Sequence, residues 1–202
     1  MLVAIPAISR TIENSRKDTF LDTVNQYVEA TRTMWASDNL SCTVGGVDYT
    51  SSAVPSGIYY VEVDSSSSTV PQLLEKGGKS PWGNREIRGI MGIAVWIEDY
   101  GTPKETRKVT FYPALVDGIH GVNVKGDAVG TTSTWKTSST LKRGSIVMTG
   151  AGYDDIGTVH ADGTVTIKNP SFHFDLNQDG DETDVIDGVN EASHYAVKCV
   201  EN

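Results

Sequence analysis

The residues best suited to chemistry lie in one acidic loop near the end of the chain. Six carboxylates fall within the thirteen residues from Asp175 to Asp187. The order Asp175-x-Asn177-x-Asp179-Gly180 reproduces the D-x-N-x-D-G spacing of calcium loops, in which alternate side chains converge on the ion and glycine allows a tight turn. Carboxylates this close repel one another without a cation. The loop therefore predicts a calcium site, with a solvated acidic loop as the alternative.

The acidic loop does not match an EF-hand. The twelfth position of an EF-hand loop is a glutamate, and here it is Ile186. The flanking residues predict strand and loop rather than two helices. Asp181 would offer its backbone carbonyl, and Asp184 or Asp187 would close the coordination. The predicted calcium ligands are Asp175, Asn177, Asp179, Asp181, Asp184 and Asp187.

Other residue types that support catalysis show no such spacing. The four histidines are scattered, without a metal-binding pattern such as HExxH; they are His120, His160, His173 and His194. The sequence contains no G-x-S-x-G, Walker A or G-x-G-x-x-G segment. Surface or core positions are the simpler interpretation of the histidines. We therefore expect a protein that is not an enzyme and whose one cofactor is a calcium ion.

The two cysteines, Cys42 and Cys199, stand far apart and form no CxxC motif. Such a pair is either a single disulfide in an oxidising compartment or two buried thiols in a reducing one. Composition alone leaves both alternatives open.

The composition bounds the class of protein. The chain has 202 residues, of which 38% are hydrophobic, with 20 glycines, a net charge of −9 and a pI of about 4.8. This suits one β-rich globular domain with a substantial core. A negative surface repels phosphate backbones, so general nucleic-acid binding is not expected. The sequence contains no apolar stretch of about 20 residues, the length that spans a membrane.

The element that precedes all these residues is a long helix, predicted from about Ala7 to Ser37. Its second half carries an apolar stripe at spacings of three, four and seven. The stripe consists of Phe20, Val24, Tyr27, Val28, Met34 and Trp35, with Leu21 beside it. Residues 13–19 contain no apolar side chain. The pattern therefore predicts that only the C-terminal half of the helix packs on the globular body, and that the N-terminal half protrudes.

The rest of the chain predicts β-structure. Alternating apolar residues between turn signals indicate strands at 57–64, 87–100, 107–116, 145–149 and 192–200, with a further hairpin that turns near 161–163. The second and third of these strands are predicted to pair as an antiparallel hairpin. The fold class is therefore α+β, a long N-terminal helix packed on an antiparallel sheet. We divide the chain into a helical part, 1–42, and a β-rich head, 43–202.

The N-terminus begins with an apolar run, Met1 to Ile8, that has no basic region before it and no small-residue cleavage site after it. It is therefore not a secretory signal peptide. It is typical of the end of a longer apolar helix, and about 15 further apolar residues upstream would complete a membrane span. A frayed terminal strand of a self-contained domain is the alternative.

Three segments resemble a known family. Residues 2–7, Leu-Val-Ala-Ile-Pro-Ala, are similar to the part of the type IV pilin helix just past its membrane-spanning part. Residues 8–19 and 74–83 resemble prepilin-like proteins of Gram-positive bacteria. The rest of the chain resembles the family only in layout, and the family's cleavage motif, a glycine before Phe-Thr-Leu-Ile-Glu, is absent.

The resemblance implies a structural subunit of a type IV pilus-like surface filament. Its partners would be copies of itself or other pilins, the assembly machinery and, before assembly, the membrane. It implies an extracellular location, a disulfide between Cys42 and Cys199, and a helix that loosens at Pro6. The implied assembly residues are Leu2, Val3, Ile5, Pro6, Ile8 and Ile12. The alternatives are a pseudopilin of a secretion or competence apparatus and, in another class, a calcium-dependent extracellular binding module.

Overall fold

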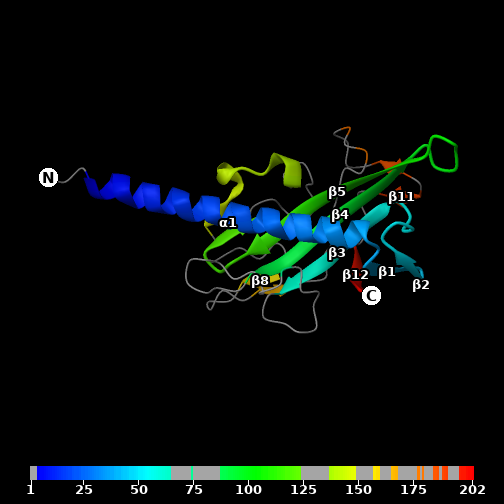
Figure 1. Ribbon diagram of the computed structural model, residues 1–202, viewed down its shortest axis with the longest axis horizontal. Helices are drawn as coiled ribbons and strands as arrows, with labels where there is room; N and C mark the ends of the chain where they lie inside the picture. Colours follow the sequence, from blue (N-terminus) through cyan, green and yellow to red (C-terminus); the bar gives the residue numbers. More distant parts are fainter. Residues whose placement is uncertain are drawn as a thin grey trace.

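One long helix lies along an eight-stranded sheet in the computed structural model of the protein (Figure 1). The structure describes residues 4–64, 74, 87–123, 137–148, 157–159, 165–167, 177, 179, 184–186, 188–190 and 196–202. The helices are α1 (Ala4–Ala36), η2 (Ser138–Thr140) and η3 (Arg143–Ser145). The strands are β1 (Leu40–Val44), β2 (Val47–Thr50), β3 (Gly57–Asp64), β4 (Arg88–Glu98), β5 (Thr106–Val116), β6 (His120–Val122), β7 (Val147–Met148), β8 (Gly157–Val159), β9 (Val165–Ile167), β10 (Val185–Ile186), β11 (Val189–Asn190) and β12 (Val197–Glu201).

The sheet is mostly antiparallel and has the order β2-β1-β12-β3-β4-β5-β6-β7. The last strand, β12, lies between β1 and β3, antiparallel to the first and parallel to the second. Two separate hairpins are formed by β8 with β9 and by β10 with β11. A helix on a mostly antiparallel sheet confirms the α+β class.

Most of the predicted strands are present. β3 has the predicted bounds, and β4 and β5 pair along their whole length, from Arg88 with Val116 to Glu98 with Thr106. The strand predicted at 145–149 is shorter, because the chain first forms the turn η3 and pairs only in β7. The β1–β2 hairpin was not predicted. Its turn is Gly45-Gly46, and both glycines have positive φ, as tight hairpin turns require.

The core lies between the second half of α1 and the sheet. Five of the six predicted stripe residues are buried there, namely Phe20, Val24, Tyr27, Val28 and Trp35, and the sixth, Met34, packs against them, as does Leu21. They meet alternate side chains of the central strands, namely Tyr59, Val61, Met91, Ile93, Val95, Phe111 and Leu115. Thr31, also buried on this helix face, donates its hydroxyl to the carbonyl of Tyr27 at 2.8 Å. The polar group is thereby satisfied inside the core.

The central strands are buried on both faces. Ile58, Ile90 and Ala94 alternate with the core residues and therefore point to the opposite face, yet they are at most 3% exposed. β9 lies against β4. Burial on both faces explains why β4 is an almost continuous apolar run rather than an alternating one.

The first half of α1 contacts the body more than the sequence indicated. The prediction that the helix packs only through its C-terminal half is wrong. The Glu13 carboxylate lies 3.2 Å from Nε2 of His120, and Asp18 forms a two-point ion pair with Arg143 of η3. The polar stretch 13–19 is held by charge, which a search for apolar periodicity does not detect.

Within the described residues, no helix is long and apolar enough to cross a membrane. The division of the chain into 1–42 and 43–202 stays a prediction.

Candidate functional site

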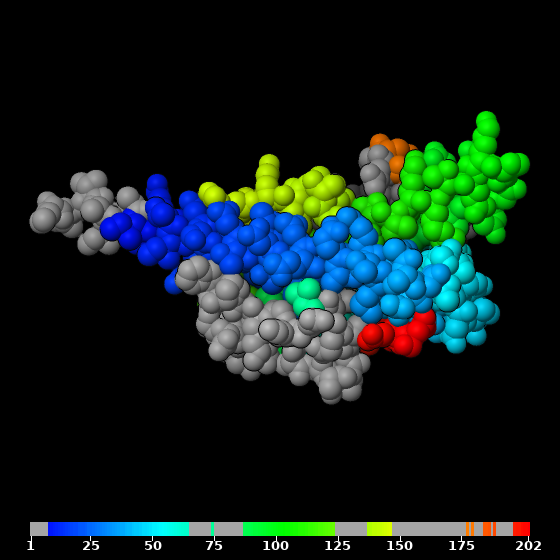
Figure 2. Space-filling model, in the orientation of Figure 1, coloured from blue at the N-terminus to red at the C-terminus, as the bar shows by residue number. Residues whose placement is uncertain are grey.

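The N-terminal end of α1 extends past the sheet, and its exposed face is the first candidate site (Figures 1 and 2). Ile8 is 58% exposed and Ile12 is 47% exposed. They are four residues apart on a helix, so they stand on the same face, one turn from each other. Two isoleucines in that position form an apolar strip that the described part of the chain leaves about half-exposed.

This strip is not a continuation of the face that packs on the sheet. Glu13 stands seven residues, or two turns, before the buried Phe20, and so continues the inward face of α1. Ile12 precedes Glu13 by one residue, which rotates it by about 100° around the helix axis. The isoleucines therefore point away from the contact with their own sheet.

The remaining predicted assembly residues are described less fully. Leu2 and Val3 lie outside the described residues. Ile5 and Pro6 lie in the first turn of α1, and Ile5 precedes Ile8 by three residues, so its backbone position falls on the same helix face. The loosening expected at Pro6 stays a prediction.

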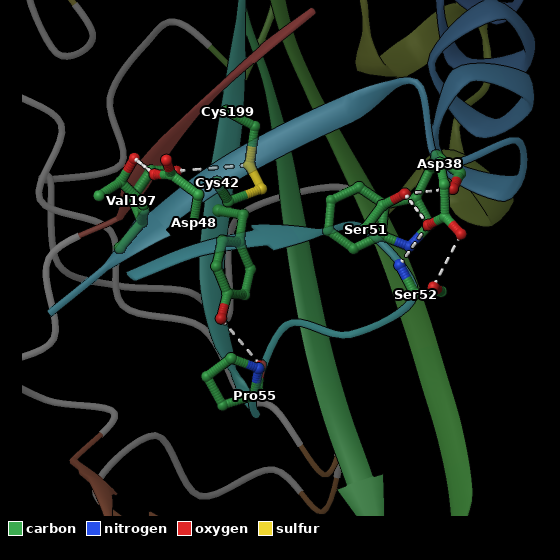
Figure 3. The surroundings of a disulfide bond; sticks show 11 residues. Asp38, Cys42, Asp48, Ser51, Ser52, Pro55, Val197 and Cys199 are labelled. Carbon is green, nitrogen blue, oxygen red and sulfur yellow. Dashed lines mark hydrogen bonds between the residues drawn. A yellow bond between two sulfur atoms is a disulfide. The ribbon is translucent and has the colours of Figure 1, made fainter. Parts of the chain in front are cut away.

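Near the opposite end of α1, the strand that follows the helix is joined to the last strand of the sheet by a disulfide (Figure 3). Cys42 in β1 and Cys199 in β12 are paired in register, with their Cα atoms 4.2 Å apart, and their sulfurs are bonded. Both residues are fully buried. The disulfide prediction is confirmed, and the alternative of two free thiols is wrong.

A polar cluster next to the disulfide fixes the turn that follows α1 (Figure 3). Asp38 has a positive φ of 55°. Its carboxylate accepts hydrogen bonds from the Ser51 hydroxyl at 2.9 Å and from the Ser52 backbone N–H and hydroxyl at 2.7 and 2.8 Å. The bonds from Ser52, with that from Ser51, lower the pKa of Asp38. Asn202 donates to the carbonyls of Asn39 and Asp38, so the last residue joins the same cluster.

The acidic loop is the second candidate site, and three of its predicted ligands are described. The amide nitrogen of Asn177 donates to Asp179 at 2.9 Å and to Asp184 at 3.2 Å. The Asp179 backbone N–H in turn donates to the Asn177 side-chain oxygen at 3.1 Å. Residues at the third, fifth and tenth positions of the motif are thus brought together around one amide group.

The other predicted ligands, Asp175, Asp181 and Asp187, lie outside the described residues. Among the residues that are described, no three His, Cys, Asp or Glu side chains are grouped so that they could hold a metal ion. Asn177 is an amide and does not count toward such a group. The complete ligand set therefore stays a prediction.

One polar cluster was missed by reasoning from the sequence. Glu13, Asp117 and His120 meet where α1 crosses the turn between β5 and β6. A signal for it was present, because Glu13 is a charged residue on the inward face of the helix, two turns before Phe20. His160, His173 and His194 lie outside the described residues.

A comparison of the chain with protein-family models, with characterised proteins and with solved structures finds no match.

Proposed function

We propose that this chain is a structural subunit of a type IV pilus-like surface filament that assembles through the N-terminal part of α1. One observation carries the proposal. The isoleucine strip, Ile8 and Ile12, is about half-exposed and lies on a helix face turned away from the one that contacts the chain's own core. Exposed apolar side chains in a row gain free energy when a second surface removes them from water.

The attachment of α1 supports the same proposal. The helix is 33 residues long, about 50 Å at 1.5 Å per residue. One face of its second half is buried in the core, and the turn and strand that follow it are held by the Asp38 cluster and the disulfide. A helix anchored at one end and uncovered at the other can pack against equivalent helices of neighbouring subunits while the head stays folded.

Assembly is tested by introducing a charge on the isoleucine strip. The variant Ile12→Asp is expected to abolish incorporation into filaments, because a carboxylate would be buried in the helix bundle without a partner. Its melting temperature should stay near that of the wild type, since Ile12 is exposed in the single chain. Incorporation is measured by electron microscopy of sheared surface filaments labelled with antibody against the chain.

Val47→Asp is the matched control. Val47 is also exposed and apolar, at 52%, but it lies on the edge strand β2 at the other end of the molecule. This variant should assemble normally. Filaments that contain Ile12→Asp as readily as Val47→Asp would contradict the proposal.

A pseudopilin is the related alternative. It would use the same helix strip in a short assembly inside a secretion or competence apparatus. The same micrographs separate the two, because a pilus subunit labels long surface filaments and a pseudopilin does not.

A second candidate function is calcium-dependent binding through the acidic loop. The observation that favours it is the meeting of Asn177, Asp179 and Asp184, three oxygen-bearing side chains of the calcium motif. A cation between the two carboxylates would relieve their repulsion, and the Asn177 oxygen could turn toward the ion. Extracellular calcium is millimolar, so a site with a dissociation constant of about 10⁻⁴ M would be largely filled.

Calcium binding is tested by thermal melts with calcium and with chelator. An ion that binds only the folded chain stabilises it by about 2.7 kcal/mol at a hundredfold excess over Kd. Asp179→Ala should remove the stabilisation, because the fifth position supplies a central ligand, while Asp162→Ala, outside the loop, should keep it. Magnesium should substitute poorly, since it demands a tighter octahedral shell. An unchanged melting temperature and no calorimetric heat at millimolar calcium would leave only a solvated acidic loop.

A further inference from the structure

His120 is enclosed between two carboxylates that come from different parts of the chain. Its Nε2 lies 3.2 Å from Glu13 on α1, and its Nδ1 lies 3.4 Å from Asp117 in the turn before β6. His120 is 1% exposed and Asp117 is 3% exposed, whereas the Glu13 side chain is 32% exposed. The ring therefore joins the buried sheet to the half-exposed first half of the helix.

The number of protons on His120 decides whether both contacts can exist. A neutral imidazole carries one N–H, so it donates to one carboxylate and turns a lone pair toward the other. Only the imidazolium, with two N–H groups, bonds Glu13 and Asp117 at once. Burial by itself would lower the pKa of His120, but the bonds to Asp117 and Glu13 outweigh it and raise that pKa.

Asp117 is the more firmly held of the two partners. One of its oxygens accepts the backbone N–H groups of Ile119 and His120, at 2.8 and 2.6 Å. Burial would raise the pKa of Asp117, yet these bonds and the one from His120 lower it. When the imidazolium loses a proton, we expect Nδ1–H to stay with Asp117, which leaves the Nε2 lone pair facing the Glu13 carboxylate.

The other elements around His120 bring no further charge to the ring among the described residues. From α1, the Phe20 ring lies 5.9 Å from it, centre to centre. The strand partners of β6 on either side are Leu115 and Val116 in β5 and Val147 and Met148 in β7. The nearest other charges along α1 are the half-buried Arg16 and Lys17 and the Asp18–Arg143 pair, which follow Glu13 within about one turn and a half.

We propose that His120 is a protonation-dependent latch that holds the first half of α1 against the sheet through Glu13 and releases it when the ring becomes neutral. Because the pKa is raised in the folded chain, the contact is at full strength below the unfolded value of about 6.5 and is lost as pH rises through the folded pKa. The latch is a property of the single chain and does not depend on filament assembly.

Hydrogen exchange of the folded full-length chain tests the latch. The exchange rate of each α1 amide is divided by its intrinsic rate at each pH. In the wild type, protection over residues 8–19 should fall about tenfold across the titration of His120, the factor for one net hydrogen bond to a charged group. Residues 24–35, whose inward-facing side chains are buried in the core, should keep their protection.

Two variants make the test specific. Glu13→Gln should remove the pH dependence, because an amide can bond the ring nitrogen in either protonation state. Asp18→Asn breaks the neighbouring ion pair and should retain the pH dependence at a lower overall protection. A wild-type helix whose protection does not change with pH, or an equal pH dependence in Glu13→Gln, would overturn the proposal.

Nitrogen NMR of the His120 ring supplies an independent readout on the wild type. Below the titration midpoint both ring nitrogens should be protonated, and above it only Nδ1. The midpoint should fall in Glu13→Gln. A neutral ring at pH 5, or a proton that stays on Nε2 at alkaline pH, is incompatible with the latch.

Discussion

The two halves of α1 are attached to the same sheet by different forces. The second half is held by apolar burial: Phe20, Val24 and Val28 are at most 2% exposed. The first half is held by charge, through Glu13 with His120 and Asp18 with Arg143. Apolar burial depends little on pH and salt, whereas ion pairs depend on both. The C-terminal half of this helix is thus attached in a way that changes little with pH and salt, whereas the attachment of its N-terminal half depends on both.

The difference follows from the side chains on one helix face. Glu13 occupies the position that Phe20 occupies two turns later, so the inward face changes from acidic to aromatic along the same line. A carboxylate gains little by meeting an apolar surface, but it binds a buried imidazolium. The residue at the inward-facing position of each turn, aromatic or acidic, therefore determines whether that turn is part of the core or only contacts the sheet through an ion pair.

The largest expected effect is that of removing the disulfide, which lies near the C-terminal end of α1. It closes a loop over a sequence separation of 157 residues, for which the chain-entropy estimate is a stabilisation of about 5 kcal/mol. Cys42→Ala/Cys199→Ala should lower the free energy of unfolding by up to this amount, measured by urea denaturation. The wild type in reducing agent should behave as the double variant does. If the urea midpoint is unchanged in the double variant and in the reduced wild type, apolar packing alone stabilises this end of the helix.

A matched pair of truncations sharpens the comparison between the halves. Phe20→Ala removes a 2% exposed ring from the core and should cost about 3–5 kcal/mol of stability. Ile12→Ala, one residue before Glu13 on the uncovered face, should change stability by less than about 0.5 kcal/mol. Both are read from chemical denaturation of the single chain. A comparable loss in the two variants would mean that Ile12 packs on its own body.

The smallest expected effect concerns the Asp18–Arg143 pair. The bond from Arg143 lowers the pKa of Asp18, so the contribution of the pair is complete above the usual carboxyl pKa and is lost as pH falls through the lowered pKa of the folded chain. Both side chains are substantially exposed, so Asp18→Asn should lower the melting temperature only slightly. The difference from wild type should vanish at about 1 M salt, where charges are screened within about 3 Å. A difference that persists at high salt would show that the contact is not mainly electrostatic.

Local patterns were sufficient to predict much of the fold. The spacing of Phe20, Val24 and Val28 predicted the buried half of α1, and β3 and the β4–β5 hairpin follow from apolar runs bounded by turn residues. The β1–β2 hairpin was missed, although its turn, Gly45-Gly46, is a signal for a tight hairpin. The place of β12 between β1 and β3 depends on pairing across more than 100 residues, which no local pattern encodes.

The candidate sites show the same limit. The calcium motif is local, and three of its residues, Asn177, Asp179 and Asp184, do meet. The cluster around His120 joins residues 107 positions apart. His120 stood alone in the sequence and was interpreted without its partners. Only the fold brings Glu13 to His120. The spacing of seven residues between Glu13 and Phe20 does show, however, that this carboxylate lies on the inward face of the helix.

The position of the disulfide also determines how the protein bears a mechanical load. A tensile force along α1 that overcomes the packing of the helix on the core reaches β1, a strand near the edge of the sheet, and would separate β1 from β12 one residue at a time. Unzipping stops at Cys42, because from there the force crosses a covalent bond into β12, which lies beside β3 in the interior of the sheet. The chain can therefore extend only over the few residues between Ala36 and Cys42 before the whole sheet resists the pull.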